Sequence, residues 1–506
     1  MTENYLNILA QTIRNNWDQP ALTDFYLTED GKAQDTSRGN HYTYGEMYAE
    51  IVRVADLLTN LGLQKGDHIA ICGANSAHWV IAYLAIAKMQ GVSVTVMHSL
   101  QPDEIARLVD FSDAKALFVE KELWEGLKEQ SLLQVQSVIA LEEWSILRGE
   151  QIDINYQLTI TNDQCQFVHG EPDELAMICF TSGTSGNSKG VMLSYLSLFS
   201  NITNTVLLSE KVSFNDNCFL SVLPYSHMFG LIDNLLSHLT IGKHVHICPL
   251  SIANSSCQVL QFVQPYGIAI TPFILKKMHE DNRGISLLKK LKYIELGGAP
   301  ISVNDEKKYL HDNIPYYNGY GLTETGPHIA TNHYNNIKIS SCGKIVSGMT
   351  CRISPDGEIL VKGENVMLGY YKDPEATAQK IDKDGWLHTG DKGHLDEDGY
   401  LYVEGRLEQD IIVLPNGENI RPDNIESLIN ALPEVKESIV LARDGKLVAI
   451  VIRDQSSVVS EADFRRKILR QINPQLPLFS QLYDVEITDV PLQRTEKMTI
   501  KRYLYS

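Results

Sequence analysis

The chain has 506 residues, of which 43% are hydrophobic and 21% are charged, a composition typical of a globular protein with more than one folding unit. Its formal net charge of −19 disfavours nucleic acid and anionic membranes as partners, because both would repel the average surface. The N-terminal segment lacks the apolar core of a secretory signal. The most apolar stretch, residues 80–97, is interrupted by Lys88, Gln90 and Gly91, so we expect no membrane span.

The eight cysteines are scattered along the chain without CxxC pairs and without histidine partners at the spacing of a zinc site. This distribution predicts reduced and mostly buried thiols. Reduced thiols are typical of a cytoplasmic protein, which is the location we expect.

Amphipathic helical patterns alternate with short apolar runs from residue 44 to residue 119. Such alternation predicts α/β architecture, a mostly parallel sheet covered by helices. The expected helices span residues 45–62, 78–89 and 103–111, and the expected strands span residues 69–72, 92–97 and 116–119. Further strands at residues 243–248, 268–271 and 293–296 extend this layered body to about residue 327.

The pattern changes after residue 340 to short alternating strands with turn signals, which predicts a small antiparallel β region. A helix at residues 422–432, a hairpin about Asp444-Gly445 and a helix at residues 461–471 then predict a small α+β domain. We therefore expect an N-terminal body of residues 1–405, which includes the β region of residues 340–405, a hinge at residues 406–408 and a C-terminal domain of residues 409–506.

A glycine-rich segment follows the apolar run of residues 175–180 and reads Thr181-Ser182-Gly183-Thr184-Ser185-Gly186-Asn187-Ser188-Lys189-Gly190. Its glycines let backbone N–H groups approach phosphate oxygens, its hydroxyls add donors, and Lys189 adds positive charge. The sequence has no Gly-Lys-Ser/Thr triplet here, which disfavours a Walker A loop. A surface linker is the alternative interpretation, since Gly/Ser/Thr runs often serve as linkers.

This loop resembles the phosphate signature of the adenylate-forming, or AMP-binding, superfamily, which contains acyl-CoA synthetases, luciferases and nonribosomal peptide adenylation domains. Segments that resemble the other family signatures follow in the family's order, at residues 223–230, 297–300, 318–324, 386–391 and 405–408. The resemblance spans residues 43 to 502, nearly the whole chain. It implies the fold of that family, in which a mobile C-terminal domain closes over the body by rotating about Glu408.

The resemblance also implies roles for individual residues toward ATP and magnesium. Tyr320 is expected to face adenine, Asn318 to bond its amino edge, Asp391 to accept from the ribose hydroxyls and Glu324 to ligate Mg²⁺. The residues implied in nucleotide binding are Thr181, Ser182, Gly183, Ser185, Gly186, Gly298, Ala299, Pro300, Asn318, Tyr320, Asp391 and Arg406. The residues implied in catalysis are Thr184, Lys189, His227, Thr323, Glu324 and Lys497.

Several of these residues have a structural interpretation when each is taken alone. A histidine among apolar residues, such as His227 in Leu223-Pro224-Tyr225-Ser226-His227-Met228-Phe229-Gly230, is more often a core residue than a substrate ligand. An isolated Asp391 or Arg406 would more often form a surface ion pair. The functional interpretation therefore depends on the set and its order.

The C-terminal tail departs from the resemblance. The family carries a lysine in a P-x-T-x-T-G-K motif, where its charge neutralises the α-phosphate and the carboxylate. Counting from Pro491 selects Lys497, with Glu496 in place of the glycine. A second register, which we favour because it preserves more residues, puts Thr499 at the lysine position and leaves Lys497 or Lys501 as a substitute.

The function implied is ATP-dependent activation of a carboxylic acid as an acyl-adenylate, followed by thioester formation with CoA. The closing Ile500-Lys501-Arg502 and residues 414–420 resemble fatty acid-CoA ligases, so a fatty acid is the first expected substrate. An aryl acid, transfer to the phosphopantetheine thiol of an acyl carrier protein, and a nucleotide-binding pseudoenzyme stay as alternatives. We find no acidic residue convincingly placed for an α-amino group, which disfavours amino-acid adenylation.

Overall fold

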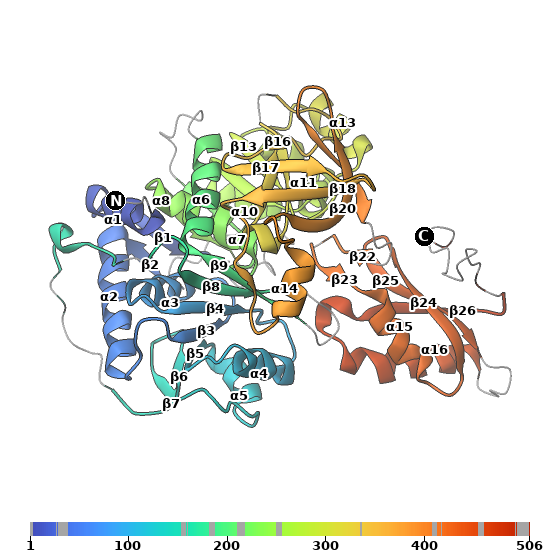
Figure 1. Ribbon diagram of the computed structural model, residues 1–506, viewed down its shortest axis with the longest axis horizontal. Helices are drawn as coiled ribbons and strands as arrows, with labels where there is room; N and C mark the ends of the chain where they lie inside the picture. The colour runs from blue at the N-terminus through green and yellow to red at the C-terminus, as the bar shows by residue number, and fades with distance from the viewer. Residues whose placement is uncertain are drawn as a thin grey trace. The chain divides into compact units, whose positions relative to one another are not determined.

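The alternating pattern of the N-terminal half folds as predicted (Figure 1). The helices are α2 (Tyr44–Asn60), α3 (Ala77–Lys88) and α4 (Pro102–Phe111), and the strands are β3 (His68–Cys72), β4 (Val92–Val96) and β5 (Ala116–Val119). α2 begins at a capping box, in which the Glu46 N–H donates to Thr43 Oγ1 at 3.1 Å and the Thr43 N–H donates to Glu46 Oε2 at 2.8 Å.

The structure is a computed structural model. It describes residues 4–26, 28, 39–152, 158, 160–168, 170–181, 188–209, 218–248, 256–333, 336–406, 412–415, 417–453, 460–490, 492 and 505. The chain divides into two compact units. The larger unit ends at Gly405, and the smaller unit contains the chain from Arg406 onward together with short segments of the N-terminal part, among them Ser99–Gln101. A layered α/β body with a separate α+β unit is the fold class expected from the sequence, and the structure confirms it.

The first sheet of the larger unit has the strand order β19-β9-β8-β4-β3-β5-β6-β7. Its remaining strands are β6 (Ser137–Ala140), β7 (Ile146–Arg148), β8 (Leu175–Phe180), β9 (Gly190–Ser194) and β19 (Gly369–Tyr370). The strands from β8 to β6 are parallel, whereas β8 and β9 are antiparallel and pair Phe180 with Gly190. The glycine-rich segment therefore connects the two strands of a hairpin.

The second sheet has the strand order β16-β15-β14-β13-β12-β10-β11-β1-β2. Its strands are β1 (Pro20–Asp24), β2 (His41–Thr43), β10 (Cys218–Ser221), β11 (His244–Ile247), β12 (Gly267–Ile270), β13 (Tyr293–Leu296), β14 (Tyr316–Gly321), β15 (His328–Thr331) and β16 (Lys344–Ile345). The strands from β1 to β14 are parallel, and antiparallel strands flank them on both sides. The carboxyl ends of the parallel strands, where α/β proteins bind ligands, thus share one edge.

A large apolar core joins the two sheets. It contains Leu22 of the second sheet, Ile69 of the first sheet, and side chains of α1 (Tyr5–Asn15), α2, α3, α6 (Tyr195–Ser209) and α8 (Ser237–Thr240). α3 is buried along its whole length up to Ala87, so it has no polar face. This burial explains why residues 80–97 are the most apolar stretch of the sequence.

Three smaller sheets follow among the described residues, one of them the two-stranded sheet of β22 (Ile412–Val413) and β23 (Asn419–Ile420). The expected β region is a four-stranded sheet of β17 (Met349–Ile353), β18 (Glu358–Gly363), β20 (Leu387–Leu395) and β21 (Leu401–Arg406). In the smaller unit, α15 (Pro422–Asn430) and α16 (Glu461–Ile472) pack on a sheet of β24 (Val435–Arg443), β25 (Lys446–Arg453) and β26 (Leu482–Thr488) (Figure 1). β26 runs parallel to β25, a pairing that the sequence pattern does not reveal.

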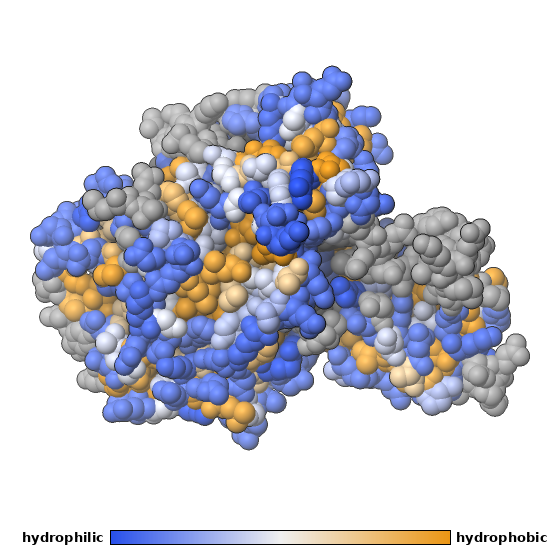
Figure 2. Space-filling model, in the orientation of Figure 1, coloured by the Kyte–Doolittle hydropathy of each residue, from blue (hydrophilic) through white to orange (hydrophobic). Residues whose placement is uncertain are grey.

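Polar residues cover most of the visible surface of the larger unit, where apolar residues form separate patches (Figure 2). Within the described ranges, no helix combines the length and the apolar character needed to cross a membrane. The cysteines are unpaired, six of them are buried, and Cys342 and Cys351 are half-buried. The expectation of reduced and mostly buried thiols is therefore confirmed.

Two glycines with nearly equal φ angles allow a test of the close approach between β15 and the chain that enters β16, at the edge of the second sheet. Gly343 has φ +89°, and an added Cβ would lie 1.8 Å from the carbonyl carbon of Thr331. Gly357 has φ +88° and open space around it. We expect Gly357→Ala to cost about 1–2 kcal/mol of stability through backbone strain alone, and Gly343→Ala to cost at least about 3 kcal/mol because the backbones must also separate. Thermal unfolding of both variants measures the difference, and equal melting temperatures would contradict it.

Candidate nucleotide and acid site

The two ends of the glycine-rich segment are fastened to each other. The Thr181 N–H donates to the carbonyl of Lys189 at 3.0 Å, and the Lys189 N–H donates to Thr181 Oγ1 at 3.2 Å. The Lys189 side chain is exposed. The predicted loop residues Ser182, Gly183, Thr184, Ser185 and Gly186 lie outside the described residues.

Tyr370 connects the base of this loop with Glu324. Its hydroxyl donates to Glu324 Oε1 at 2.7 Å, and Lys189 Nζ lies 4.7 Å from the centre of its ring. Burial, followed by the nearby charge of Glu324, raises the pKa of Tyr370, so its hydroxyl stays protonated and donates. Tyr370 lies on β19, which pairs with β9, whereas Glu324 lies in the short helix η3 (Thr323–Thr325) that follows β14. Two sequence motifs of the larger unit thus meet at one tyrosine.

Tyr320 and Asp391 form a second contact between predicted site residues. The Tyr320 hydroxyl donates to Asp391 Oδ2 at 2.5 Å, and this bond joins the end of β14 to β20. Asp391 is buried, with 4% of its surface exposed, whereas Tyr320 is half-buried. The Asp391 N–H donates to Thr389 Oγ1 at 3.0 Å, which fixes the backbone behind the carboxylate.

Asn318 is buried and bonded to the protein through both ends of its amide. Its Oδ1 accepts from Asn332 Nδ2 at 2.8 Å, and its Nδ2 donates to the carbonyl of Ser341 at 3.0 Å. An amide oxygen has two lone pairs, so Oδ1 keeps one acceptor position for a further donor.

The segment around His227 is anchored by Asn75. Asn75 Nδ2 donates to the carbonyl of Leu223 at 2.7 Å, and the Tyr225 N–H donates to Asn75 Oδ1 at 2.9 Å. His227 is half-buried and precedes the helical turn α7 (Met228–Leu231). The Cys179 thiol at the end of β8 contacts the carbonyl of Ser226 at 3.3 Å, which places this segment beside the strand that leads into the phosphate loop.

Gly297 brings the predicted adenine wall against the same segment. A Cβ on Gly297 would lie 2.9 Å from the ring of Phe229, so the absence of a side chain lets the ring approach the strand end. Gly298 follows with φ +76° and is exposed, Ala299 is half-buried, and Pro300 is exposed. The segment around His227 and the segment that begins at Gly297 are therefore neighbours.

The remaining predicted residues are placed in part. Thr323 is half-buried and begins η3. Arg406 ends β21, and its side chain is not described. Glu408, Lys497 and Lys501 lie outside the described residues. The roles assigned to these residues stay predictions.

Tyr370 and Asn332 belong to this site and were not found from the sequence. Tyr370 stands beside a second tyrosine, Tyr371, whose hydroxyl donates instead to Asp113 Oδ2 at 2.7 Å. The dipeptide carries no signal that selects one ring over the other. Only the pairing of β19 with β9 decides which tyrosine faces Glu324.

Two family profiles and several known proteins match this chain. A family profile described as AMP-binding enzyme matches residues 9–371, and one described as AMP-binding enzyme C-terminal domain matches residues 409–505. The 4-coumarate–CoA ligase 3 of Oryza sativa subsp. japonica is 26% identical over 475 residues, which cover 87% of this chain and 83% of that protein. The 4-coumarate–CoA ligase 1 of Solanum tuberosum is 28% identical over 473 residues, which cover 87% of this chain and 84% of that protein.

A solved structure shares the fold over the whole chain. The o-succinylbenzoate CoA synthetase MenE of Bacillus subtilis superposes with a TM-score of 0.76 and 24% identity, covering 98% of this chain and 97% of that chain. At 24% identity, the likeness between the two proteins shows a shared fold.

We expect Tyr370→Phe to weaken the binding of MgATP about tenfold, because Glu324 loses a hydrogen bond to its charged group, an interaction worth about 1.5–3 kcal/mol. Titration calorimetry with and without Mg²⁺ measures this effect, and the loss should appear only when the metal is present. Tyr371→Phe is the matched control, since it removes a hydroxyl bonded to Asp113. Equal losses in the two variants would contradict the role of Tyr370.

Proposed function

Because the chain belongs to the AMP-binding enzyme family, we propose that it is an AMP-forming acid–thiol ligase, which activates a carboxylic acid with ATP and transfers the acyl group to CoA. The two 4-coumarate–CoA ligases support the proposal, since their names pair a carboxylic acid with CoA. They match nearly nine tenths of this chain, so the likeness includes both units.

The reaction has two steps whose atoms balance without a further reagent. A carboxylate oxygen attacks the α-phosphorus of ATP, the bond to the β-phosphate breaks, and pyrophosphate leaves. The thiol of CoA, after losing its proton, then attacks the acyl carbon and releases AMP. Because the phosphoryl group needs little covalent help, the protein contributes positioning and charge compensation.

In this proposal, the nucleotide is held by the residues that the sequence singled out. Tyr320 and Asn318 bind adenine, and Asp391 binds the ribose. Lys189 and the glycine-rich segment stabilise the departing pyrophosphate, while Thr323 and a tail lysine stabilise the α-phosphate. Glu324 fits a magnesium ligand, because Tyr370 bonds to Oε1 and a carboxylate supplies the hard oxygen that Mg²⁺ prefers. Magnesium, when bound, supplies positive charge to the phosphates.

One observation supports this assignment most strongly. Tyr370 contacts both Lys189 and Glu324, and Tyr320, which lies in the same short segment as Glu324, bonds to Asp391. These residues come from four distant parts of the sequence. A nucleotide needs contacts to its base, sugar and phosphates at once, and this arrangement offers them at one place.

Experiment decides whether the acid substrate is a fatty acid or an aryl acid. The fatty acid stays a prediction from the closing sequence, whereas the two relatives are named for 4-coumarate, an aryl acid. A cytoplasmic location and transfer to an acyl carrier protein also stay predictions.

ATP–pyrophosphate exchange with a panel of fatty and aryl acids tests the proposal. We expect acid-dependent exchange, and a CoA thioester when CoA is added. Exchange without thioester product would point to a carrier protein as acceptor. ATP binding without exchange for any acid would favour a pseudoenzyme and overturn the proposed ligase.

Separate substitution of Lys497 and Lys501 by alanine tests the register of the tail. We expect one variant to lose at least about a hundredfold in exchange rate, in line with a loss of roughly 3–4 kcal/mol of transition-state stabilisation. The other variant is the control and should stay within about threefold of the unsubstituted enzyme. Unchanged rates in both would remove a tail lysine from the mechanism.

A further inference from the structure

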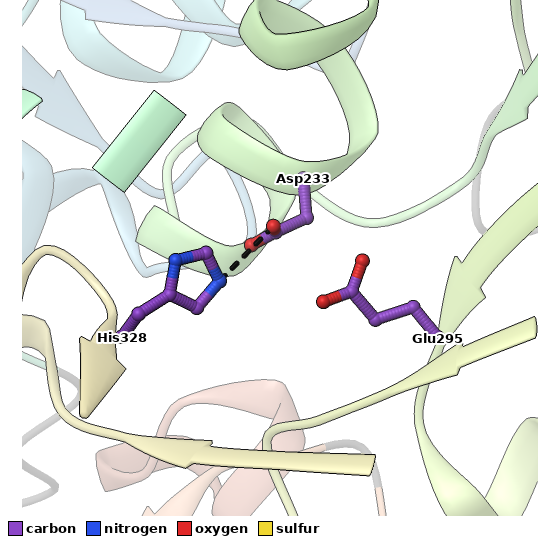
Figure 3. Close-up of side chains that lie close together, drawn as sticks. All are labelled: Asp233, Glu295 and His328. Carbon is purple, nitrogen blue, oxygen red and sulfur yellow. Dashed lines mark ion pairs between the residues drawn. The ribbon is translucent and has the colours of Figure 1, made fainter. Parts of the chain in front are cut away.

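Three buried side chains of the larger unit lie close together (Figure 3). Asp233 comes from the π-helical turn η2 (Ile232–Leu236), Glu295 from β13 and His328 from β15. His328 Nε2 lies 3.1 Å from Asp233 Oδ1, and one N or O atom of each residue lies within 4.8 Å of the others. We call these three residues the acidic cluster.

The acidic cluster is held in place by α6 and by β14. Thr205 Oγ1 donates to Asp233 Oδ1 at 2.7 Å, and Asn201 Oδ1 accepts from the His328 N–H at 2.9 Å. Asn201 and Thr205 are four residues apart, so they lie on one face of α6. On the opposite side, the hydroxyl of Tyr317 bonds to Glu295.

The cluster contains more acceptors than donors. Burial, followed by the charge of Asp233, raises the pKa of Glu295 well above its usual value. Among the described residues, Asp233 Oδ2 and His328 Nδ1 have no hydrogen-bond partner, whereas His328 Nε2 faces Asp233 Oδ1 at 3.1 Å. Asp233 has no exposed surface and His328 is 7% exposed, so both side chains are buried. An unsatisfied buried polar atom costs about 1–3 kcal/mol, which a bound cationic donor would offset.

The cluster continues directly from the segments proposed to hold the acid and the nucleotide. Asp233 lies on the helix that begins after His227, and six residues of helix advance about 9 Å along the axis. Glu295 lies two residues before Gly297, and His328 lies four residues after Glu324. η2, β13 and β15 therefore each connect the cluster to a residue of the proposed acid or nucleotide site.

We propose, on the basis of the proposed function, that Asp233, Glu295 and His328 form the subsite for an ammonium group carried by the carboxylic acid substrate. The substrate is then an acid whose amine is separated from its carboxylate by several bonds. This position differs from that of an α-amino group, for which the sequence has no convincingly placed acidic residue. Asp233 and Glu295 are the specificity-determining carboxylates.

An alkyl or aryl tail fits the acidic cluster less well, because it would leave the carboxylates desolvated with no compensating charge. A divalent metal is the competing cation. Its ligand atoms stand about 3.4 Å apart for bonds near 2.1 Å, and His328 Nε2 lies 3.1 Å from Asp233 Oδ1. A metal analysis of the purified protein decides between the two cations.

Pairs of acids that differ by an ammonium and a methyl group test the subsite. We would compare 5-aminopentanoate with hexanoate, and 4-(aminomethyl)benzoate with 4-ethylbenzoate, by pyrophosphate exchange and by calorimetric binding to the whole protein. We expect at least one amine to exceed its isostere tenfold in kcat/KM. Exchange with hexanoate or 4-ethylbenzoate but with neither amine would overturn the subsite and leave the proposed ligase standing.

The variants Asp233→Asn and Glu295→Gln should each remove this tenfold preference while MgATP affinity stays unchanged. Glu306→Gln is the matched control, because Glu306 is an equally buried carboxylate that accepts from the Ser340 N–H at 2.7 Å, outside the cluster. If no acid exchanges, the proposed ligase fails, but calorimetric binding of an amine that Asp233→Asn abolishes would still support the subsite. A stoichiometric metal that copurifies with the protein and is lost in Asp233→Asn would overturn the proposal.

Discussion

The closed turn between β14 and β15 is the constraint on which both proposed sites depend. The Leu322 N–H donates to the carbonyl of Pro327 at 3.0 Å, and a Cβ on Gly321 would lie 1.6 Å from that same oxygen. No side chain fits at Gly321, so the two strands approach at this point as closely as their backbones allow. Tyr320 and Glu324 project from this turn toward the nucleotide residues, and His328 follows it into the acidic cluster. The spacing between the two sites is therefore set by one short segment.

Two carboxylates of the proposed nucleotide site each accept a hydrogen bond from a tyrosine hydroxyl. Tyr320 donates to Asp391, and Tyr370 donates to Glu324. At Glu324 the bond engages Oε1, so Oε2 is the oxygen we propose for Mg²⁺. Glu295 also accepts from a tyrosine hydroxyl, yet burial and the charge of Asp233 dominate, and its pKa rises.

Sequence reasoning predicted the elements well where their pattern is local. β5 and β13 have the predicted bounds, and the α/β body and the small β region follow from apolar periodicity and turn residues. Long-range pairings were not predictable in this way. The parallel pairing of β26 with β25, and the pairing of β19 with β9 that aims Tyr370 at Glu324, join segments far apart in the chain. The sequence likewise gives no signal for Asp233, Glu295 and His328, because they lie in three separate segments that come together only in the folded protein.

The polarity of the acidic cluster also decides how sharply such an enzyme discriminates among acids. A hydrophobic pocket distinguishes chains that differ by one methylene by only about 1–3 kcal/mol. A site built from buried acceptors rejects an analogue without donors much more strongly, because Asp233 and Glu295 would then stay desolvated and unpaired. In the proposed subsite this penalty arises inside the larger unit, between η2, β13 and β15.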